Sequence, residues 1–222
     1  MRDKITRVLV AVKNAFTAYK TGFRRDKKSE VLFENFTRAL DSELKTYSIK
    51  YDYLCGKDTV NIDGVSNGVF LSDGDTVLMD ISVGHGGVWC DVTRTFFVGN
   101  VIEEQERAFD LIVKSIRAGE KALKVGVNAG AIYDAVNGVY KSAGKSLIHH
   151  AGHRIGRECL LNPRFIKDND DKLNDFELFA IESGLYDGFG IRLENDYYLT
   201  ADGAEDLFED LMPLNIKEYI LR

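Results

Sequence analysis

Residues 76–98 decide the fold, and they read TVLMDISVGHGGVWCDVTRTFFV. Both ends of this stretch are rich in the β-branched and aromatic residues that favour strands, and glycines interrupt it in the middle. His85-Gly86 predicts the two-residue loop of a β-hairpin, because an X-Gly pair is a typical hairpin signal. With that loop, Asp80 lies directly opposite Asp91 on the neighbouring strand. We therefore expect two carboxylates to face each other across the first hairpin.

A second hairpin is predicted near the C-terminus, with strands at 178–186 and 189–199. Residues 187–189, Asp-Gly-Phe, form its loop, which places Glu182 directly opposite Glu194. Directly opposed like charges destabilise a sheet, and burial within apolar strands raises that cost. A divalent cation between the carboxylates removes the repulsion. Two such pairs in one small protein therefore favour a metal site.

On this pattern alone, the paired carboxylates are also compatible with two arrangements that need no metal. The carboxylates could pair with Arg94 and Arg192, or two of them could share a proton as an acid dyad. The histidines favour the metal, because three of the four lie in the run His149-His150-Ala151-Gly152-His153, just before the second hairpin. An imidazole with four carboxylates is a suitable ligand set for Mn, Fe, Co or Zn.

The rest of the chain has the spacing of amphipathic helices. Apolar residues recur at steps of three and four in residues 5–19, 32–44, 109–116 and 132–140. We expect Ser29 to cap the second helix, Gly126 to separate the last two, and a short helix near Ala204. The order helix, helix, hairpin then occurs twice. This order predicts an α+β fold in which residues 1–222 form a single domain of two similar halves.

The composition argues against several classes of protein. Of 222 residues, 29 are basic and 35 are acidic, and the net charge of −6 argues against binding to nucleic acid, which needs a basic surface. Cys55, Cys90 and Cys159 show no C-x-x-C spacing, which favours a reducing environment. No apolar run approaches the ~20 residues of a membrane-spanning helix. We expect a cytoplasmic protein without a membrane partner, either a monomer or a homodimer.

Four motifs resemble those of the pita-bread metallopeptidases, the M24-type family of methionine aminopeptidase, aminopeptidase P and prolidase. In chain order they are Asp80 with Asp91-Val-Thr-Arg-Thr-Phe96, Gly152-His153-Arg-Ile-Gly156, Ile181-Glu182-Ser-Gly-Leu-Tyr186 and Arg192-Leu-Glu194-Asn-Asp196. The corresponding family patterns are D…DxTRTF, GHxxG, IEPGxY and RIED. The Arg-x-Glu form, and His149 four residues before the histidine of GHxxG, favour the Xaa-Pro aminopeptidase and prolidase branch.

The resemblance implies both a fold and a site. The fold is the pita-bread fold, in which two pseudo-symmetric helix-helix-hairpin halves surround a curved antiparallel sheet. The site holds two divalent metal ions, with manganese expected first and cobalt, iron or zinc as alternatives. The implied ligands are Asp80 on one metal, His153 and Glu182 on the other, and Asp91 and Glu194 bridging both.

The resemblance also implies the reaction. A metal-activated hydroxide attacks the carbonyl of a small peptide or amide, with Glu182 as its proton acceptor and His149 as a further catalytic residue. The residues that orient the ligands or hold the substrate are expected among Thr93, Thr95, Arg154 and Arg192.

Departures from the family pattern affect the expected activity. Leu160 stands where the family has a catalytic histidine, and the segment 55–75 lacks the histidine that precedes the first aspartate. Ser183 replaces the proline of IEPG, and we expect no N-terminal domain of the prolidase type. Activity on standard peptides should therefore be weak. The alternatives are a metal-dependent enzyme of changed chemistry with a specialised substrate, or a non-catalytic binding module.

Overall fold

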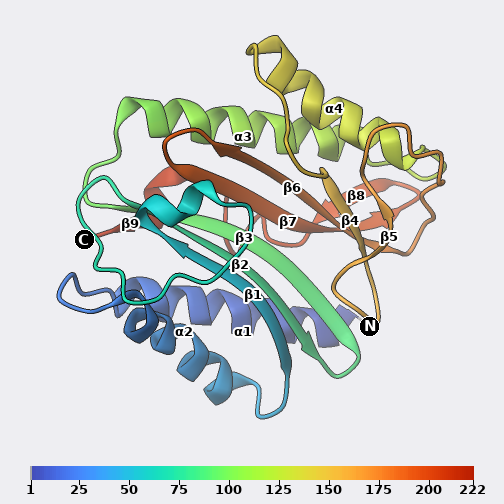
Figure 1. The fold of residues 1–222 in the computed structure, drawn as a ribbon. Coiled ribbons are helices and arrows are strands. Elements are labelled where there is room, and N and C mark those ends of the chain that lie inside the picture. The colour runs from blue at the N-terminus through green and yellow to red at the C-terminus, as the bar shows by residue number, and fades with distance from the viewer. Residues whose placement is uncertain (1) are drawn as a thin grey trace.

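The computed structural model describes residues 2–222, which form two halves of similar construction (Figure 1). The first half contains α1 (Arg2–Thr21), α2 (Ser29–Glu43), β1 (Ser48–Cys55), the 3₁₀ helix η1 (Gly56–Val60), β2 (Thr76–His85) and β3 (Val88–Val98). The second contains α3 (Glu103–Ala122), α4 (Ala129–Ser142), β4 (Gly152–Ile155), β5 (Leu161–Arg164), β6 (Leu178–Tyr186), β7 (Gly190–Thr200) and β8 (Gly203–Asp206). The 3₁₀ helix η2 (Ile216–Tyr219) and β9 (Ile220–Leu221) follow.

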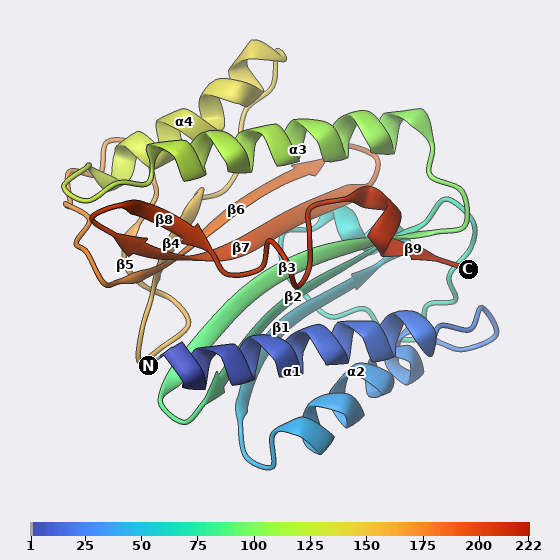
Figure 2. The same cartoon turned by 180° about the vertical axis from the view of Figure 1, so that it is seen from behind.

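Two curved sheets lie side by side in the middle of the molecule. One has the strand order β1-β2-β3-β9, and the other has the order β5-β4-β6-β7-β8. Strand β3 of the first sheet packs against β7 of the second. Helices α1 and α2 cover the outer face of the first sheet, and α3 and α4 cover that of the second, as Figures 1 and 2 show. The expected α+β pita-bread architecture of two helix-helix-hairpin halves is therefore confirmed.

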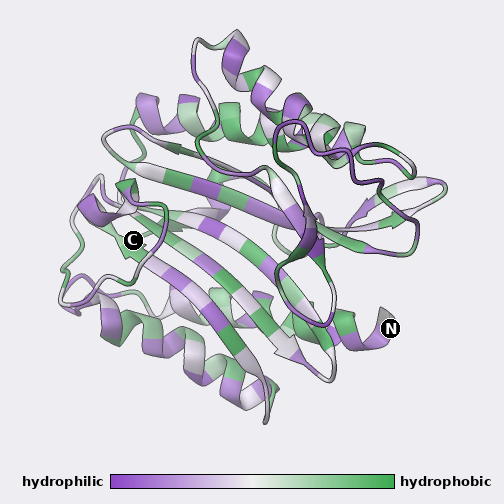
Figure 3. Cartoon of the chain, turned by 45° about the vertical axis from the view of Figure 1, so that its right-hand side comes forward, coloured by the Kyte–Doolittle hydropathy of each residue, from purple (hydrophilic) through white to green (hydrophobic). Residues whose placement is uncertain are grey.

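The helices bury the apolar faces that their sequence spacing predicts. Val8, Val12 and Phe16 of α1 pack in one core with Phe36 of α2. In Figure 3, hydrophobic and hydrophilic residues accordingly alternate along the helices. Every helix of residues 2–222 falls short of the length or the apolar character that crossing a bilayer requires.

The predicted cap of α2 is wrong, because the helix begins at Ser29 itself. Lys28 precedes it in an extended conformation, with no capping hydrogen bond from its side chain. The Ser29 backbone N–H donates to the Val69 carbonyl at 2.8 Å. Its buried hydroxyl lies 3.4 Å from the Ser66 carbonyl. Ser29 therefore ties the start of the helix to the segment before β2.

The second hairpin has the predicted register, and the first does not. Glu182 lies directly opposite Glu194. In the first hairpin, Asp80 pairs with Thr93, two residues away from Asp91. The loop is Gly86-Gly87, with φ angles of 61° and 84°. A tight hairpin turn of this type needs positive φ at both central positions, which glycines adopt without strain and a histidine does not.

This shift moves the first carboxylate pair from opposite positions to diagonal ones. Asp91 pairs directly with Ser82, which is two residues beyond Asp80 on β2. Residues two apart on a strand point to the same face of a sheet. Both carboxylates therefore still lie on one face.

The sequence patterns did not predict five of the strands, namely β1, β4, β5, β8 and β9. Most are short or rich in polar residues, so their hydrophobic alternation is weak. The helix expected near Ala204 is wrong, because Ala204 belongs to β8, which pairs with β7. Such strands form where an existing edge offers unpaired backbone groups, and no local sequence pattern reveals that edge.

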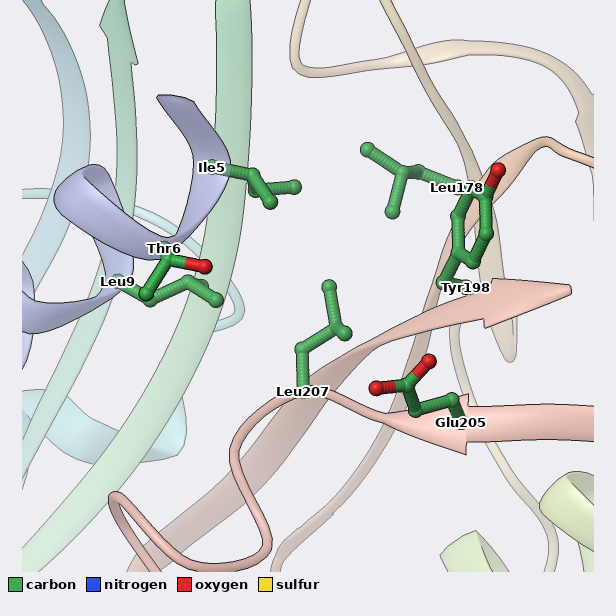
Figure 4. Close-up of a pocket in the computed structure, with 7 residues that line it drawn as sticks. All are labelled: Ile5, Thr6, Leu9, Leu178, Tyr198, Glu205 and Leu207. Carbon is green, nitrogen blue, oxygen red and sulfur yellow. The ribbon is translucent and has the colours of Figure 1, made fainter. Parts of the chain in front are cut away.

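A small opening of about 150 Å³ lies where the start of α1 faces the second sheet (Figure 4). The side chains of Ile5, Leu9, Leu178 and Leu207 point into it, beside Tyr198. A different set of residues lines the larger cavity between the two hairpins. The opening therefore lies apart from the expected metal site.

Candidate metal centre

The two hairpins enclose a cavity of about 470 Å³. All five predicted ligands line this cavity. They come from five strands, Asp80 from β2, Asp91 from β3, His153 from β4, Glu182 from β6 and Glu194 from β7. The packing of β3 against β7 brings the two hairpins together at this point. Residues far apart in the sequence thus meet in one site.

Asp91, His153 and Glu194 form the tightest group in the cavity. Each offers one ligand atom, and these atoms all lie within 4.8 Å of one another. The Nε2 of His153 lies 3.6 Å from Asp91 Oδ2 and 3.8 Å from Glu194 Oε1. All three residues are buried. Two carboxylates and an imidazole at this separation fit a divalent cation such as Mn, Fe, Co or Zn.

Two hydroxyl groups hold the carboxylates of this group in place. Ser82 Oγ donates to Asp91 Oδ1 at 2.9 Å, and Thr93 Oγ1 donates to Glu194 Oε2 at 2.8 Å. Such hydrogen bonds fix the orientation of a metal-binding carboxylate. Thr93, one of the residues expected to orient a ligand, thus donates to one of the predicted ligands.

Asp80 has an arginine partner, as one of the open alternatives proposed. Arg192 Nη2 donates to Asp80 Oδ2 at 2.5 Å and lies 3.6 Å from Asp52 Oδ2. Its other amino group donates to the Ile62 carbonyl at 2.6 Å. Arg192 is buried, and Asp80 is partly exposed to the cavity. The ion pair occupies one oxygen of Asp80 and orients the carboxylate.

Arg94, the second arginine of that alternative, pairs with none of the carboxylates and has a different role. It is fully buried, and its guanidinium donates to the carbonyls of Thr93, Glu194 and Met212, to the Asn195 amide oxygen and to the Tyr219 hydroxyl. The bond from Arg94 Nη1 to the Glu194 carbonyl is 2.6 Å long. Arg94 thus fixes the backbone of a ligand and satisfies carbonyl groups that the core would otherwise bury unpaired.

Two histidines lie against Glu182. His150 Nδ1 is 3.0 Å from Glu182 Oε1, and His149 Nδ1 is 3.6 Å from Oε2. His149 Nδ1 also lies 2.7 Å from the His150 carbonyl oxygen. The buried Nε2 of His149 has no hydrogen-bond partner within residues 2–222. Glu182 therefore sits between two imidazoles at one side of the cavity.

Burial controls the protonation of the central carboxylates. It raises the pKa of Asp91 well above the ordinary value, and the nearby Asp80 carboxylate raises it further. The pKa of Glu194 is raised for the same two reasons, with Asp91 as the main neighbour. For Asp80 itself, burial outweighs the opposing effect of Arg192 and raises the pKa to about 6. A cation in the cavity would stabilise the ionised carboxylates and so oppose these shifts.

Glu182 differs from the other carboxylates in its charge state. Burial alone would raise its pKa, but His150, His149 and Arg192 together outweigh burial and lower it. Glu182 therefore carries a negative charge over the ordinary pH range. The raised pKa values of Asp91 and Glu194 favour the protonated form of those two carboxylates instead.

The metal-free protein should lose stability as the pH rises. The pKa values of Asp91 and Glu194 are higher in the folded state than in the unfolded state. Their protonation therefore stabilises the fold fully below the unfolded pKa, and this contribution is lost as the pH rises through the folded pKa. With chelator present, this contribution to the melting temperature should fall as the pH rises above the ordinary carboxylate range of about 4.

Thermal unfolding of Asp91→Asn and Glu194→Gln under the same conditions provides the comparison. Each variant lacks one member of the pair, so its melting temperature should depend less on pH than that of the wild type. The lowered pKa values of His149 and His153 and the raised pKa of His150 add slopes of their own, but these are common to all three proteins, so the difference between wild type and variant reports the carboxylate. Equal slopes in all three proteins would contradict this electrostatic description.

Two of the expected orienting or substrate residues lie away from the ligands. Thr95 exchanges two hydrogen bonds of 3.0 Å with the backbone of Arg192, so it joins β3 to β7. Arg154 donates to the Asn162 carbonyl and to Glu177, both at 2.7 Å, and is not among the described residues that line the cavity. It follows His153 on β4 and therefore faces the other side of the strand. Arg154 is thus held by Asn162 and Glu177, and a role in orienting a ligand or holding the substrate stays a prediction.

Sequence reasoning missed three groups at the site. Ser82 and Asp196 each lie two residues from a predicted ligand on the same strand, so the period of two could have found them. The Asp91 backbone N–H donates to Asp196 Oδ2 at 3.0 Å. The third group, His150, lies in the segment before β4, whose conformation no periodic pattern predicts.

The structure explains one departure from the family pattern and places another in the site. Ser183 is buried, and its hydroxyl lies 2.6 Å from that of Ser115 and 2.7 Å from that of Tyr140. These hydroxyl groups form a satisfied buried cluster where the family has proline. Leu160 lines the metal cavity, so an apolar side chain occupies a wall of the site.

The two sheets, each covered by a pair of helices, and the buried carboxylate–imidazole group between them are the arrangement of the pita-bread class. The sequence pattern of metallopeptidase family M24 matches residues 2–201, so the chain belongs to this family. It is 33% identical over 151 residues to an uncharacterised peptidase of Methanocaldococcus jannaschii. The aligned stretch covers 65% of this chain and 42% of that protein. It is 30% identical over 133 residues to the Xaa-Pro dipeptidase of Lactobacillus helveticus, and this alignment covers 58% of this chain and 36% of the dipeptidase.

A solved structure agrees in fold. The X-Pro aminopeptidase of Thermotoga maritima superimposes with a TM-score of 0.88 at 20% identity, over 99% of this chain and 62% of that one. The chain thus spans about two fifths of the length of the curated relatives, 42% in one and 36% in the other. The expected family is confirmed.

Proposed function

We propose that the chain is a dinuclear metal-dependent hydrolase of the Xaa-Pro aminopeptidase and prolidase type, acting on short peptides or small amides. The observation that carries this proposal is the Asp91, His153 and Glu194 group in a cavity that Asp80 and Glu182 also line. Membership of the metallopeptidase family supports it. We also propose that residues 1–222 act as one catalytic unit, since all five ligands come from this stretch.

The proposed ligands divide between two metal positions. Asp91 and Glu194 belong to the tightest group and would be shared by both ions. Asp80 would bind one ion, and His153 with Glu182 would bind the other. Four carboxylates balance the charge of two divalent cations, and a ligand set rich in oxygen favours manganese, with cobalt, iron or zinc as alternatives.

Two divalent cations held by these residues would supply Lewis acidity, which polarises a substrate carbonyl and lowers the pKa of a bound water. The protein groups complete the site. Glu182 is ionised in the cavity and is proposed to accept a proton, while His150 and His149 hold its carboxylate. The unpartnered Nε2 of His149 supports a catalytic role for this histidine.

The residues near the ligands suggest slow turnover of ordinary substrates. Leu160 has no hydrogen-bonding group with which to hold a substrate carbonyl or its tetrahedral intermediate. The segment before β2 contributes Ile62 and Asp63 to the cavity, and no histidine from that segment. Loss of one such donor commonly lowers the rate by roughly 10²–10³. We therefore propose weak activity on standard Xaa-Pro peptides.

The cysteines support the proposed location. Cys55, Cys90 and Cys159 are all free and buried. Unpaired thiols are usual in proteins of reducing compartments. We propose that the protein works in the cytoplasm on a small substrate.

Release of free amino acid from defined peptides tests the proposed function. Protein loaded with Mn²⁺, Co²⁺, Fe²⁺ or Zn²⁺ is incubated with Ala-Pro, Leu-Pro and a tripeptide. We expect slow release that chelator abolishes and that Glu182→Gln lowers by at least about 10²-fold, because a positioned proton acceptor contributes about 10²–10⁴. Equal release with and without chelator, or no release from any peptide or simple amide, would contradict the proposal.

A further inference from the structure

A cavity of about 300 Å³ lies between helix α1 and the C-terminal segment 211–219. Figure 2 shows the chain between β8 and η2 on the same side of the molecule as α1. The walls include the buried side chains of Phe16, Phe96 and Tyr219. No described residue lines both this cavity and the metal cavity. A concave space of this size with mainly apolar walls is typical of a small-molecule site.

The charged groups at this cavity favour an anionic ligand. Lys13 and Lys20 both line it and lie seven residues apart on α1, so they share one face of the helix. Lys20 donates a hydrogen bond to the Glu218 carbonyl. The ammonium group of Lys13, which is partly buried, has no ion-pair or hydrogen-bond partner within residues 2–222. Glu218 is the one acidic residue among the described lining residues, so the two lysines leave the lining positive.

The apolar walls restrict the kind of anion that fits. Leu211 and Met212 line the cavity beside the aromatic rings, and an aliphatic or aromatic group would gain by covering them. A small, strongly hydrated anion such as phosphate would lose its hydration against these walls. A carboxylate on an apolar body satisfies both requirements, because its charge can pair with Lys13 at the rim while its body fills the interior.

Two residues of this cavity hold the guanidinium of Arg94. The Tyr219 hydroxyl accepts from Arg94 Nε at 2.9 Å and donates to the Pro213 carbonyl at 2.8 Å. The Met212 carbonyl accepts from Arg94 Nη2 at 2.6 Å. Tyr219, Met212 and Pro213 all line the cavity. A ligand that packs against Tyr219 and Met212 therefore restrains the groups that position Arg94.

Arg94 extends the same hydrogen-bond network to the metal centre. Its Nη1 donates to the Glu194 carbonyl at 2.6 Å and to the Thr93 carbonyl at 2.9 Å. The Thr93 hydroxyl in turn donates to Glu194 Oε2 at 2.8 Å. One buried guanidinium thus joins the cavity wall to the backbone of a predicted metal ligand. Such a network is the kind of physical connection that couples binding at two sites.

We propose that the cavity between α1 and segment 211–219 binds a small carboxylate with an aliphatic or aromatic body, and that its occupancy tightens metal binding through Arg94. The bound ligand holds Tyr219 and Met212 in place, so less ordering remains when Glu194 binds a cation. By linkage, bound metal tightens carboxylate binding by the same factor. The coupling rests on the proposed metal centre, whereas the carboxylate site stands without it.

Titration of 4-phenylbutyrate into the full chain in chelator tests the site, because without a cation the carboxylate cannot bind to a metal. The methyl signals of Met212 and Leu160 in NMR spectra report the two cavities separately. We expect a saturable shift at Met212 and none at Leu160. The neutral 4-phenylbutanamide should bind about threefold or more weakly, because it lacks the charge that pairs with Lys13. No saturable shift at Met212, or equal affinity for the amide, would overturn the site.

A pair of lysine variants locates the anion. Lys13→Gln should weaken 4-phenylbutyrate about threefold to fivefold and leave the affinity for the amide unchanged. Lys114→Gln removes an exposed lysine of α3 and should change neither affinity. Equal loss in both variants, or no loss in Lys13→Gln, would contradict the site. A Met212 signal that shifts on dilution of the ligand-free protein would assign the cavity to a second copy of the chain and would also overturn the proposal.

Calorimetric titration of Mn²⁺ with and without saturating 4-phenylbutyrate tests the coupling. We expect Mn²⁺ to bind about fivefold or more tightly in its presence, at the lower end of usual coupling between sites. Tyr219→Phe keeps the ring but loses the hydroxyl that accepts from Arg94, so it should still bind 4-phenylbutyrate and lose most of this gain. Unchanged Mn²⁺ affinity in the wild type would overturn the coupling. If the wild type bound no metal, the proposed function would fail, while a shift at Met212 would still support the carboxylate site.

Discussion

Replacement of Asp91 with alanine is expected to remove metal-dependent stabilisation of the protein. A ligand at 100 times its Kd stabilises a fold by about 2.7 kcal/mol, which for a domain of this size raises the melting temperature by roughly 5–10 °C. Wild-type protein should show this rise when Mn²⁺ is added after chelation. Asp91→Ala should show little or none, because Asp91 belongs to the tightest ligand group. Thermal unfolding with and without Mn²⁺ measures the effect.

The same experiment makes a second, opposite prediction for the chelated proteins. Without a cation, the buried Asp91 carboxylate lies close to other acidic groups, and its pKa is raised. Removal of that carboxylate relieves the unfavourable burial of charge, so Asp91→Ala should melt no lower than the wild type in chelator. Asp134→Ala, which changes an exposed aspartate of α4, is the matched control. If Asp91→Ala kept both the bound metal and its stabilisation, Asp91 would not be a ligand.

Replacement of Leu160 with histidine is expected to raise the turnover of Xaa-Pro dipeptides. The wild type should hydrolyse Ala-Pro well below the usual enzyme range of ~1–10³ per second. A histidine at this position would place a hydrogen-bond donor in the wall of the cavity, and such a donor contributes roughly 10²–10³ in rate when well aligned. Because the new side chain is not optimised, we expect an increase in kcat of about 10-fold or more. Steady-state kinetics on Ala-Pro measures it.

The neighbouring residue provides the control for this substitution. Leu161 begins β5 and is not among the described residues that line the cavity. Leu161→His adds the same group outside the site and should leave turnover unchanged. Wild-type turnover within the usual range would contradict the expected weakness, and would mean that His149 or His150 already performs the missing role. No change in Leu160→His would indicate that the cavity serves a different reaction.

The sequence predicts the helices and the central hairpins because their patterns are local. The helix periodicity in α1 and α3 follows from one buried face. The register of the second hairpin follows from its three-residue loop, and Glu182 and Glu194 are opposed as expected. The first register failed because His85-Gly86 and Gly86-Gly87 are both possible loops. Only the positive φ angles of the two glycines decide between them.

The remaining elements depend on distant contacts. β1 carries the burial pattern of a partly exposed strand and pairs along its whole length with β2. Its polar residues Lys50 and Asp52 gave no clear alternation, so the strand was not predicted. β8 was expected to be helical near Ala204, yet the free edge of β7 determines its conformation.

The sequence motifs predict the ligands of the candidate site, but they do not predict which side chains form hydrogen bonds or ion pairs with those ligands. Asp80, Asp91 and Glu194 were identified by spacing and resemblance, and all line one cavity. The ion pair between Arg192 and Asp80 was one of several alternatives before the structure placed the two side chains together. The position of His150 against Glu182 depends on the path of the chain between α4 and β4. That path is set by packing and not by local sequence.

Metal content tests the central claim most directly. Wild-type protein is purified without chelator, incubated with excess Mn²⁺, freed of unbound metal by gel filtration and measured by elemental analysis. We expect two divalent ions per chain in the wild type and at most one in Glu194→Gln, because Glu194 is proposed to bridge both ions. The absence of Mn, Fe, Co and Zn from the wild-type protein after this treatment would contradict the dinuclear metal centre.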